Sequence, residues 1–246
     1  MTSKQDRVLL GMLTPSSNTT LEPVTTAMVA GLPEATAHFG RFRVTEIALS
    51  QQALGQFDMA PMLAATDLLA DARCNAICWN GTSAGWLGFD RDRQLCAEIE
   101  RRTGIRATSA VLALLDAFRL AGVTRYGLVS PYTDDIQQAI VANFARSGFE
   151  CVAERHTGIR VNFDFSTIEP ADIDRMLDEV AAARPQAVVV LCTNMDGAGL
   201  AEDFERRSGA LLLYSISTAA WGSLRTAGVD TRRVRGWGRL FTLIGA

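Results

Sequence analysis

Cys192 is the side chain best placed for chemistry in this sequence. It ends the apolar run Ala187–Cys192 and precedes Gly199–Arg207, a segment with the spacing of a helix. A thiol close to a helix N-terminus is favoured as a thiolate, because backbone N–H groups and the helix dipole stabilise the anion. Such a group can act as a nucleophile or as an acid and base. The competing interpretation is a structural cysteine buried at the end of a strand.

Hydroxyl and amide side chains follow strand-like segments and could hold an anion. Candidates in the first half are the turn Pro15–Asn18, with Ser16 and Asn18, and the turn Gly81–Ser83, with Thr82 and Ser83. In the second half, Thr193 and Asn194 follow a strand-like segment. Hydroxyls, amides and backbone N–H groups at these turns can bind a carboxylate or a developing oxyanion. Tyr132 could donate a phenolic hydrogen bond to the same place. The simpler interpretation is helix capping, which Ser, Thr and Asn also favour.

Ligands for a metal or a cofactor are scarce. The chain has five cysteines and two histidines, without the spacing of a zinc site or a disulfide framework. The segment Gly197-Ala198-Gly199 lacks the third glycine of the dinucleotide fingerprint, and there is no P-loop and no G-x-S-x-G elbow. We interpret the remaining cysteines as core residues: Cys74, Cys78, Cys96 and Cys151. The sequence therefore argues against a metal site and gives only a weak match to nucleotide-binding motifs.

Strand-like and helix-like segments alternate along the chain. The first half predicts strands at Val8–Leu13, His38–Ile47, Asn75–Trp79 and Ala107–Ser109. It predicts helices at Leu21–Ala30, Met59–Ala72, Arg91–Arg102 and Val111–Leu120. This alternation is typical of a parallel sheet built from right-handed crossovers, with helices on both faces. We therefore expect an α/β fold.

The pattern then starts again, which predicts two similar halves. Gly11-Met12-Leu13-Thr14-Pro15 is echoed by Gly127-Leu128-Val129-Ser130-Pro131, and further short matches follow in the same order. We expect two pseudo-symmetric, Rossmann-like lobes, residues 1–122 and 123–246, with the C-terminal segment packing back across the join. Ligands bind at the carboxyl ends of parallel strands, so the polar turns should meet in a cleft between the lobes.

Composition excludes several classes of protein. The 246 residues are 48% hydrophobic and 21% charged, with a net charge of −3. This is ample for a packed core, and the absence of a basic surplus argues against nucleic acid as the main partner. No apolar run approaches the roughly 20 residues that span a membrane. The polar N-terminus shows no signal peptide, so we expect a cytoplasmic protein.

Several of these motifs resemble the aspartate/glutamate racemase superfamily. They are Pro15-Ser16-Ser17-Asn18-Thr19-Thr20, Gly81-Thr82-Ser83, Tyr132-Thr133-Asp134-Asp135 and Cys192-Thr193. The more specific resemblance is to its branch that holds maleate cis-trans isomerase and arylmalonate decarboxylase, and it spans essentially the whole chain. It implies two pseudo-symmetric α/β halves, no cofactor, and a small carboxylic acid as substrate. Similar proteins are often dimers, so a homodimer is one expectation.

One position departs from the pattern of the racemases and isomerases. Those enzymes place a cysteine on each side of the cleft, one from each half. Here the second-half position is Cys192, but the first-half position is Gly81. A two-base racemase needs a thiol on each face of its substrate, and Gly81 supplies none.

The resemblance to arylmalonate decarboxylase accounts for this departure. It implies that Thr82, Ser83 and Tyr132 bind the retained carboxylate, helped by the backbone of Cys192 and Thr193. Loss of CO2 leaves an enediolate, which such donors stabilise, and Cys192 then delivers a proton to one face. We therefore expect a cofactor-independent decarboxylase of a malonate-type acid.

Two other functions stay open at this point. Asn18 and Asn162 resemble the carboxylate-binding asparagines of maleate isomerase, which favours an isomerase or racemase of a small dicarboxylate or amino acid. A non-catalytic carboxylate-binding protein is the third hypothesis.

Overall fold

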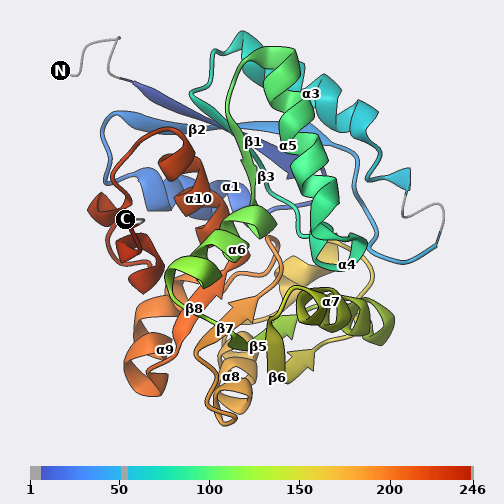
Figure 1. The fold of residues 1–246 in the computed structure, drawn as a ribbon, viewed down its shortest axis with the longest axis vertical. Coiled ribbons are helices and arrows are strands. Elements are labelled where there is room, and N and C mark those ends of the chain that lie inside the picture. The colour runs from blue at the N-terminus through green and yellow to red at the C-terminus, as the bar shows by residue number, and fades with distance from the viewer. Residues whose placement is uncertain (1–6, 51–54, 245–246) are drawn as a thin grey trace.

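Two four-stranded parallel sheets form the framework of the protein (Figure 1), in a computed structural model that describes residues 7–50 and 55–244. The strand order is β2-β1-β3-β4 in the first sheet and β6-β5-β7-β8 in the second. Both halves therefore repeat one topology. The prediction of an α/β fold, with two similar halves that each form a parallel sheet flanked by helices, is confirmed.

The first sheet and its neighbouring helices come from the first half of the chain. Its strands are β1 (Val8–Pro15), β2 (Ala35–Phe42), β3 (Ala76–Trp79) and β4 (Ala107–Ser109). The helices of this half are α1 (Leu21–Val29), α3 (Met59–Asp71), α4 (Ala84–Leu87), α5 (Phe89–Thr103) and α6 (Ala110–Leu120). Helix α3 packs on β1 and β2, and α5 packs on β4.

The second sheet comes from the second half. Its strands are β5 (Arg125–Ser130), β6 (Glu150–His156), β7 (Ala187–Val190) and β8 (Leu211–Tyr214). The helices are α7 (Asp134–Arg146), α8 (Pro170–Ala181), α9 (Ala201–Ser208) and α10 (Ser215–Thr226). Short 3-10 turns lie at Phe163–Thr167, Ala198–Leu200, Thr231–Arg233 and Arg239–Thr242.

The helix that ends each half packs against the other half. Helix α10 contacts β3, β4 and α1 of the first half, and it lies along α6. Phe118 of α6 packs its ring 5.5 Å from that of Tyr126 in β5 and 6.2 Å from that of Phe144 in α7. A Cβ on Gly222 of α10 would lie 2.6 Å from the Cβ of Ala113 in α6. A glycine is therefore required for these two helices to approach so closely.

Strand β2 differs from the sequence prediction. It ends at Phe42, where its pairing with β1 ends at Pro15, whereas the sequence predicted a strand to Ile47. The chain beyond Phe42 turns to the second half instead. The backbone N–H of Ile47 donates to the Arg160 carbonyl, and Glu46 forms an antiparallel bridge with Val161.

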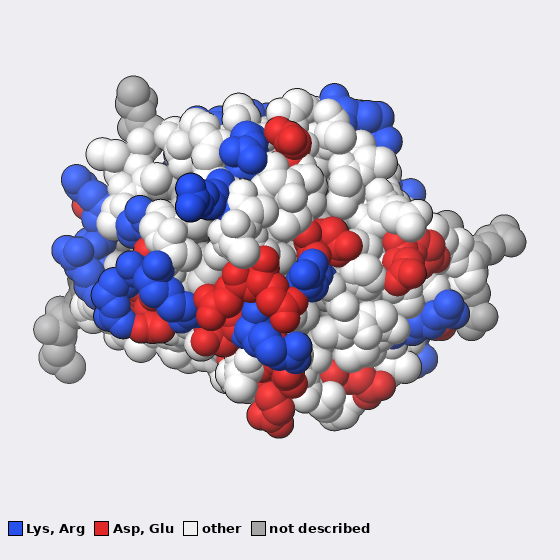
Figure 2. Space-filling model, turned by 90° about the horizontal axis from the view of Figure 1, so that it is seen from below, with Lys and Arg blue, Asp and Glu red and all other residues white. Residues whose placement is uncertain are grey.

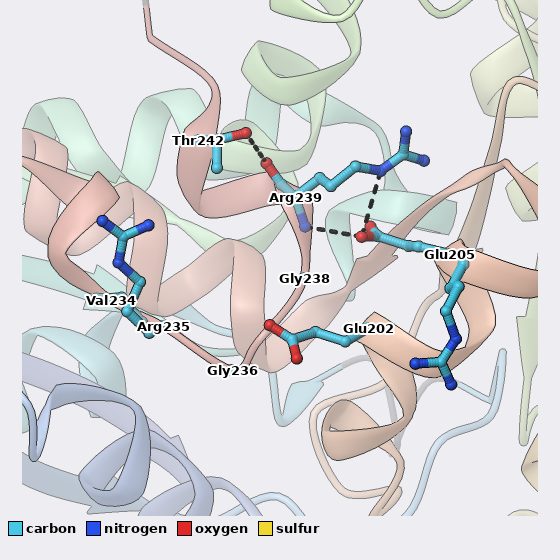
Figure 3. Close-up of a pocket in the computed structure, with 9 residues that line it drawn as sticks. Glu202, Glu205, Val234, Arg235, Gly236, Gly238, Arg239 and Thr242 are labelled. Carbon is cyan, nitrogen blue, oxygen red and sulfur yellow. Dashed lines mark hydrogen bonds and ion pairs between the residues drawn. The ribbon is translucent and has the colours of Figure 1, made fainter.

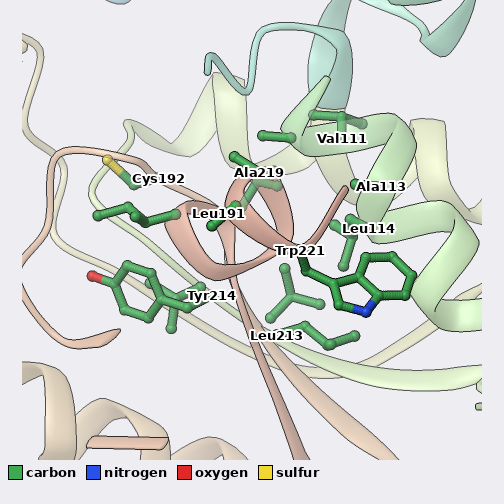
Figure 4. Packing of buried hydrophobic residues seen from close by; sticks show 14 of the residues in the cluster. Val111, Ala113, Leu114, Leu191, Cys192, Leu213, Tyr214, Ala219 and Trp221 are labelled. Atoms are coloured by element: carbon green, nitrogen blue, oxygen red, sulfur yellow. The ribbon is translucent and has the colours of Figure 1, made fainter. Parts of the chain in front are cut away.

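The core is continuous across both sheets. Strands β3, β7 and β8 are buried along their whole length, as expected for parallel strands with both faces covered. Figure 4 shows Leu213 and Tyr214 of β8 together with Trp221 of α10 in this core. All three side chains are fully buried, so the core packs through the region where the two halves meet.

Charged side chains of both signs are interspersed on the face seen in Figure 2.

Among the described residues, no helix is long and apolar enough to cross a membrane. In that same part of the chain, His, Cys, Asp and Glu side chains form no group that could hold a metal ion.

We expect the buried carboxyl of Asp92 to lower the free energy of unfolding as the pH rises. This carboxyl, in the first turn of α5, is 2% exposed. Burial raises its pKa to about 7, although a hydrogen bond from Ser109 lowers the pKa in part. The folded chain then keeps a proton that the unfolded chain loses near its pKa of about 4, so stability falls between about pH 4 and 7. Asp92→Asn should raise Tm relative to the wild type at pH 8 but not at pH 5. The control is Asp90→Asn, an exposed carboxylate in the same turn. An identical pH dependence in wild type and Asp92→Asn would contradict the assignment.

Candidate active site

A small pocket lies where the carboxyl ends of the strands of both halves face each other. Its polar lining consists of Gly81, Thr82, Ser83, Tyr132, Asn162, Cys192 and Thr193. Its apolar lining consists of Pro15, Val44, Ile47, Phe57, Trp79 and Trp86. The cavity measures about 20 Å³, which is room for about one water. It is therefore a nearly closed site, lined by polar and apolar side chains, that would have to widen to admit a ligand larger than water.

A pair of hydroxyls forms the centre of the polar lining. The Thr82 Oγ1 and Tyr132 Oη atoms are 2.6 Å apart, and they come from different halves of the chain. Only one of the two hydroxyl hydrogens can lie between the oxygens, so the pair has one further O–H, which Tyr132 can direct to Cys192 or to a ligand. Burial raises the pKa of Tyr132 well above its ordinary value, so this phenol is a neutral donor. Trp86 and Phe165 hold the tyrosine ring by edge contacts at 5.1 and 5.5 Å between centroids.

The Cys192 side chain is a neutral thiol, which corrects the expectation of a thiolate. Burial raises its pKa to about 12, although hydrogen bonds from the Asn194 N–H and the Tyr132 hydroxyl lower it in part. The backbone nitrogen of Asn194 lies 3.2 Å from the Cys192 sulfur. The sequence placed this thiol near a helix start, but α9 begins only at Ala201. Desolvation, the largest cause of the shift, outweighs the hydrogen bonds at the sulfur and decides its protonation state.

Thr193 fixes the turn of Cys192 to the opposite half. Its hydroxyl donates to the Asn80 carbonyl at 2.9 Å and accepts from Asn18 Nδ2 at 3.1 Å. The same Asn18 nitrogen donates to the Thr193 carbonyl at 2.9 Å. The Tyr214 hydroxyl holds the far end of this turn by donating to the Met195 carbonyl. The two polar turns are thus locked together.

Ser16 and Asn18 were expected in the binding site but do not line it. The side-chain oxygen Oδ1 of Asn18 accepts hydrogen bonds from the backbone N–H groups of Thr20 and Leu21, at the start of α1. With its amide nitrogen bonded to Thr193, this side chain is occupied at both ends. The Ser16 hydroxyl exchanges hydrogen bonds with the backbone of Val44. Both residues hold the surrounding loops rather than face the cavity.

Asn162 does reach the cavity, and its loop is held from both sides. Its side-chain nitrogen donates to Ser17 Oγ at 2.9 Å, and its backbone carbonyl accepts from Asn194 Nδ2 at 2.6 Å. Eight of the ten residues expected in the site therefore line the same pocket: Pro15, Gly81, Thr82, Ser83, Tyr132, Asn162, Cys192 and Thr193.

The sequence did not single out the aromatic lining. Trp79 ends β3, and Trp86 lies in α4, a short helix that was not predicted. Helix α4 is held by Asn143 of α7, whose side-chain nitrogen donates to the carbonyls of Ala84 and Gly85 at 3.0 Å. Trp79 could have been found from strand alternation, because it lies two residues before Gly81 and shares its side of the strand.

The other cysteines lie away from this pocket. Cys78 is buried beside α10, where burial raises its pKa to about 12 and Ser223 hydrogen-bonds it. Cys74, Cys96 and Cys151 also have pKa values raised by burial and do not line the cavity. This agrees with their interpretation as core residues.

A more open hollow between α9 and the C-terminal segment is no better candidate (Figure 3). It measures about 370 Å³, and its central carboxylate, Glu205, is already occupied. Glu205 accepts from the backbone N–H groups of Leu212 and Arg239, and the Arg239 side chain also contacts it. The hollow therefore holds a structural ion pair, with no group free for chemistry at Glu205.

We expect Cys192 to resist ionisation through the alkaline range. A pKa near 12 keeps the thiol protonated from about pH 7 to about pH 10. An ultraviolet titration of wild type minus Cys192→Ala should therefore show no thiolate absorbance in this range. A step near the ordinary thiol pKa of about 8.5 would contradict the assignment.

Comparison with known proteins identifies relatives over most of the chain. The family model for arylmalonate decarboxylase matches residues 33–241. The chain is 23% identical to maleate isomerase of Geobacillus stearothermophilus over 233 residues, which are 90% of this chain and 92% of that protein. It is 25% identical to arylmalonate decarboxylase of Bordetella bronchiseptica over 164 residues, or 65% of this chain and 68% of that protein. The structure of Nocardia farcinica maleate cis-trans isomerase bound to TRIS has the same fold, with a TM-score of 0.86 at 23% identity over 95% of this chain and 97% of that one.

Proposed function

Because the chain belongs to the arylmalonate decarboxylase family of enzymes, we propose that it decarboxylates a malonate-type acid without a cofactor. The observation that carries this proposal is a single buried thiol, Cys192, in a pocket that both polar and apolar side chains line. A malonate has two carboxylates, and decarboxylation treats them differently. A lining of both kinds can treat the two carboxylates differently.

The polar lining is suited to the carboxylate that the product retains. The Thr82–Tyr132 pair has one hydroxyl hydrogen that can turn from Cys192 to a ligand, and Ser83 adds a third hydroxyl at the cavity. Negative charge grows on this carboxylate as the C–C bond breaks and an enediolate forms. Neutral donors fixed in place stabilise that charge more than they stabilise the substrate, which lowers the barrier.

The apolar lining is suited to the carboxylate that leaves. Val44, Ile47, Phe57 and Trp79 offer no hydrogen-bond partner comparable to water for a carboxylate. A carboxylate there loses hydration, and it recovers that cost when it departs as neutral CO2.

Cys192 then supplies the proton. The electron pair of the broken C–C bond resides in the enediolate, and the thiol S–H transfers its proton to the α-carbon. The thiolate that remains takes a proton from water, so each turnover consumes one proton and releases one CO2. A thiol with a pKa near 12 starts in the protonated form that this step requires.

The same facts do not favour the isomerase alternative. Addition of sulfur to a double bond needs a thiolate, and a two-base exchange needs a second acid or base. The thiol is protonated, and the matching position in the first half is Gly81.

We expect Cys192→Ala to abolish turnover and to spare binding. Proton NMR in D2O with a panel of substituted malonates, maleate and aspartate should show CO2 loss and deuterium on one face of the product. The variant should lose at least about 1,000-fold in rate, since no other acid replaces the thiol. Cys151→Ala, a cysteine outside the pocket, is the matched control. Turnover of maleate, exchange at the α-carbon of aspartate, or activity retained by Cys192→Ala would each contradict the proposal.

We expect Thr82→Val and Tyr132→Phe to weaken binding of the carboxylate. Each removes one hydroxyl of the pair, and a hydrogen bond to a charged group contributes about 1.5–3 kcal/mol, or roughly a tenfold to hundredfold rise in KM. The double variant should raise KM by less than the two single effects combined, because the two hydroxyls act together. Thr157→Val is the control, since its hydroxyl binds the Pro131 carbonyl outside the cavity. An unchanged KM in both single variants would remove the pair from the site.

A further inference from the structure

The indole of Trp79 occupies the space where a side chain at position 81 would lie. A Cβ built on Gly81 would come within 1.9 Å of Trp79 Cζ2 and within 2.4 Å of Cε2. No real Cβ tolerates such contacts, so Gly81 and Trp79 depend on each other. The indole is also held firmly, because it is 1% exposed and packs against Phe42 at 5.1 Å between ring centroids.

The second half shows what the same position looks like without the indole. Trp79 is the last residue of β3, and Val190 is the last residue of β7, the corresponding strand of the second sheet. Two residues later the chain carries Gly81 in the first half and Cys192 in the second. Val190 is smaller than Trp79, and the residue two positions after it, Cys192, carries a side chain. After Trp79, the equivalent side-chain position is filled by the indole.

We propose that Trp79 is the specificity-determining residue that makes this a one-thiol site. Both Trp79 and Cys192 line the cavity of about 20 Å³, so the indole that occupies the side-chain position of residue 81 borders the same space as the thiol. It takes the position of a second acid or base and shields that face from water. The steric part of this proposal stands alone; the part about proton delivery rests on the proposed function.

The steric part is tested by thermal unfolding of four proteins: wild type, Gly81→Cys, Trp79→Val and the double variant. Valine is chosen because it is the residue at the matching position, Val190. Gly81→Cys should lower Tm by several degrees in the wild-type background and by much less in the Trp79→Val background. Trp86→Val is the matched control, since Trp86 lines the same cavity but supplies none of the three atoms nearest the Cβ position of residue 81, all of which belong to Trp79. In the Trp86→Val background, Gly81→Cys should lower Tm by as much as it does in the wild-type background.

The catalytic part is tested by deuterium exchange at the α-carbon of enantiopure 2-phenylpropanoate in D2O. In the double variant, one thiolate removes the α-proton to give the enediolate, and the opposite thiol returns a deuteron to the other face. Exchange with racemisation should exceed that of Gly81→Cys and of Trp79→Val by at least tenfold. It should vanish when Cys192→Ala is added.

Two results would overturn the assignment of Trp79. One is an equal loss of Tm for Gly81→Cys in both backgrounds. The other is exchange in Gly81→Cys alone that matches the double variant. If the wild type decarboxylates no malonate while the Tm values are coupled, the proposed function fails and the steric role of Trp79 is upheld.

Discussion

The hydroxyl of Thr193 joins the two halves of the protein at the point where chemistry is proposed. It donates to the Asn80 carbonyl and accepts from Asn18, so it ties the turn before Gly81 to the turn that carries Cys192. Each half has its own sheet, and nothing in one sheet sets the position of the other. These buried hydrogen bonds, together with the exchange of α6 and α10 between the halves, fix the distance across the cleft. The orientation of the Cys192 thiol toward the Thr82–Tyr132 pair depends on these hydrogen bonds and helix contacts.

Burial then sets the chemistry that the pocket can perform. The same desolvation that raises the pKa of Cys192 to about 12 keeps Tyr132 neutral. A site made of neutral donors stabilises a charge that develops during reaction, and a neutral thiol can end the reaction by giving up its proton. The apolar side chains of the same lining complete the pocket proposed to treat two carboxylates of one substrate differently.

The fold and most of the site could be predicted from sequence, because both follow from local patterns. Alternating segments indicated parallel sheets, and polar turns after strands indicated where ligands bind. Asn18 does not line the pocket, which its sequence could not show, because a buried amide that bonds the start of α1 and Thr193 has the same local sequence as one that binds a ligand. The thiolate expectation failed because desolvation depends on what packs around Cys192. Trp79 was missed because its overlap with the position 81 side chain is a matter of three-dimensional packing.

The most direct test of the account is a crystal structure of Cys192→Ala soaked with a substituted malonate. One carboxylate should lie within hydrogen-bond distance of Thr82 Oγ1 or Tyr132 Oη, and the other should lie against the apolar lining. The α-carbon should face the Cβ of residue 192 on one side and the indole of Trp79 on the other. A malonate with both carboxylates in polar contacts, or with its α-carbon turned away from residue 192, would contradict the account.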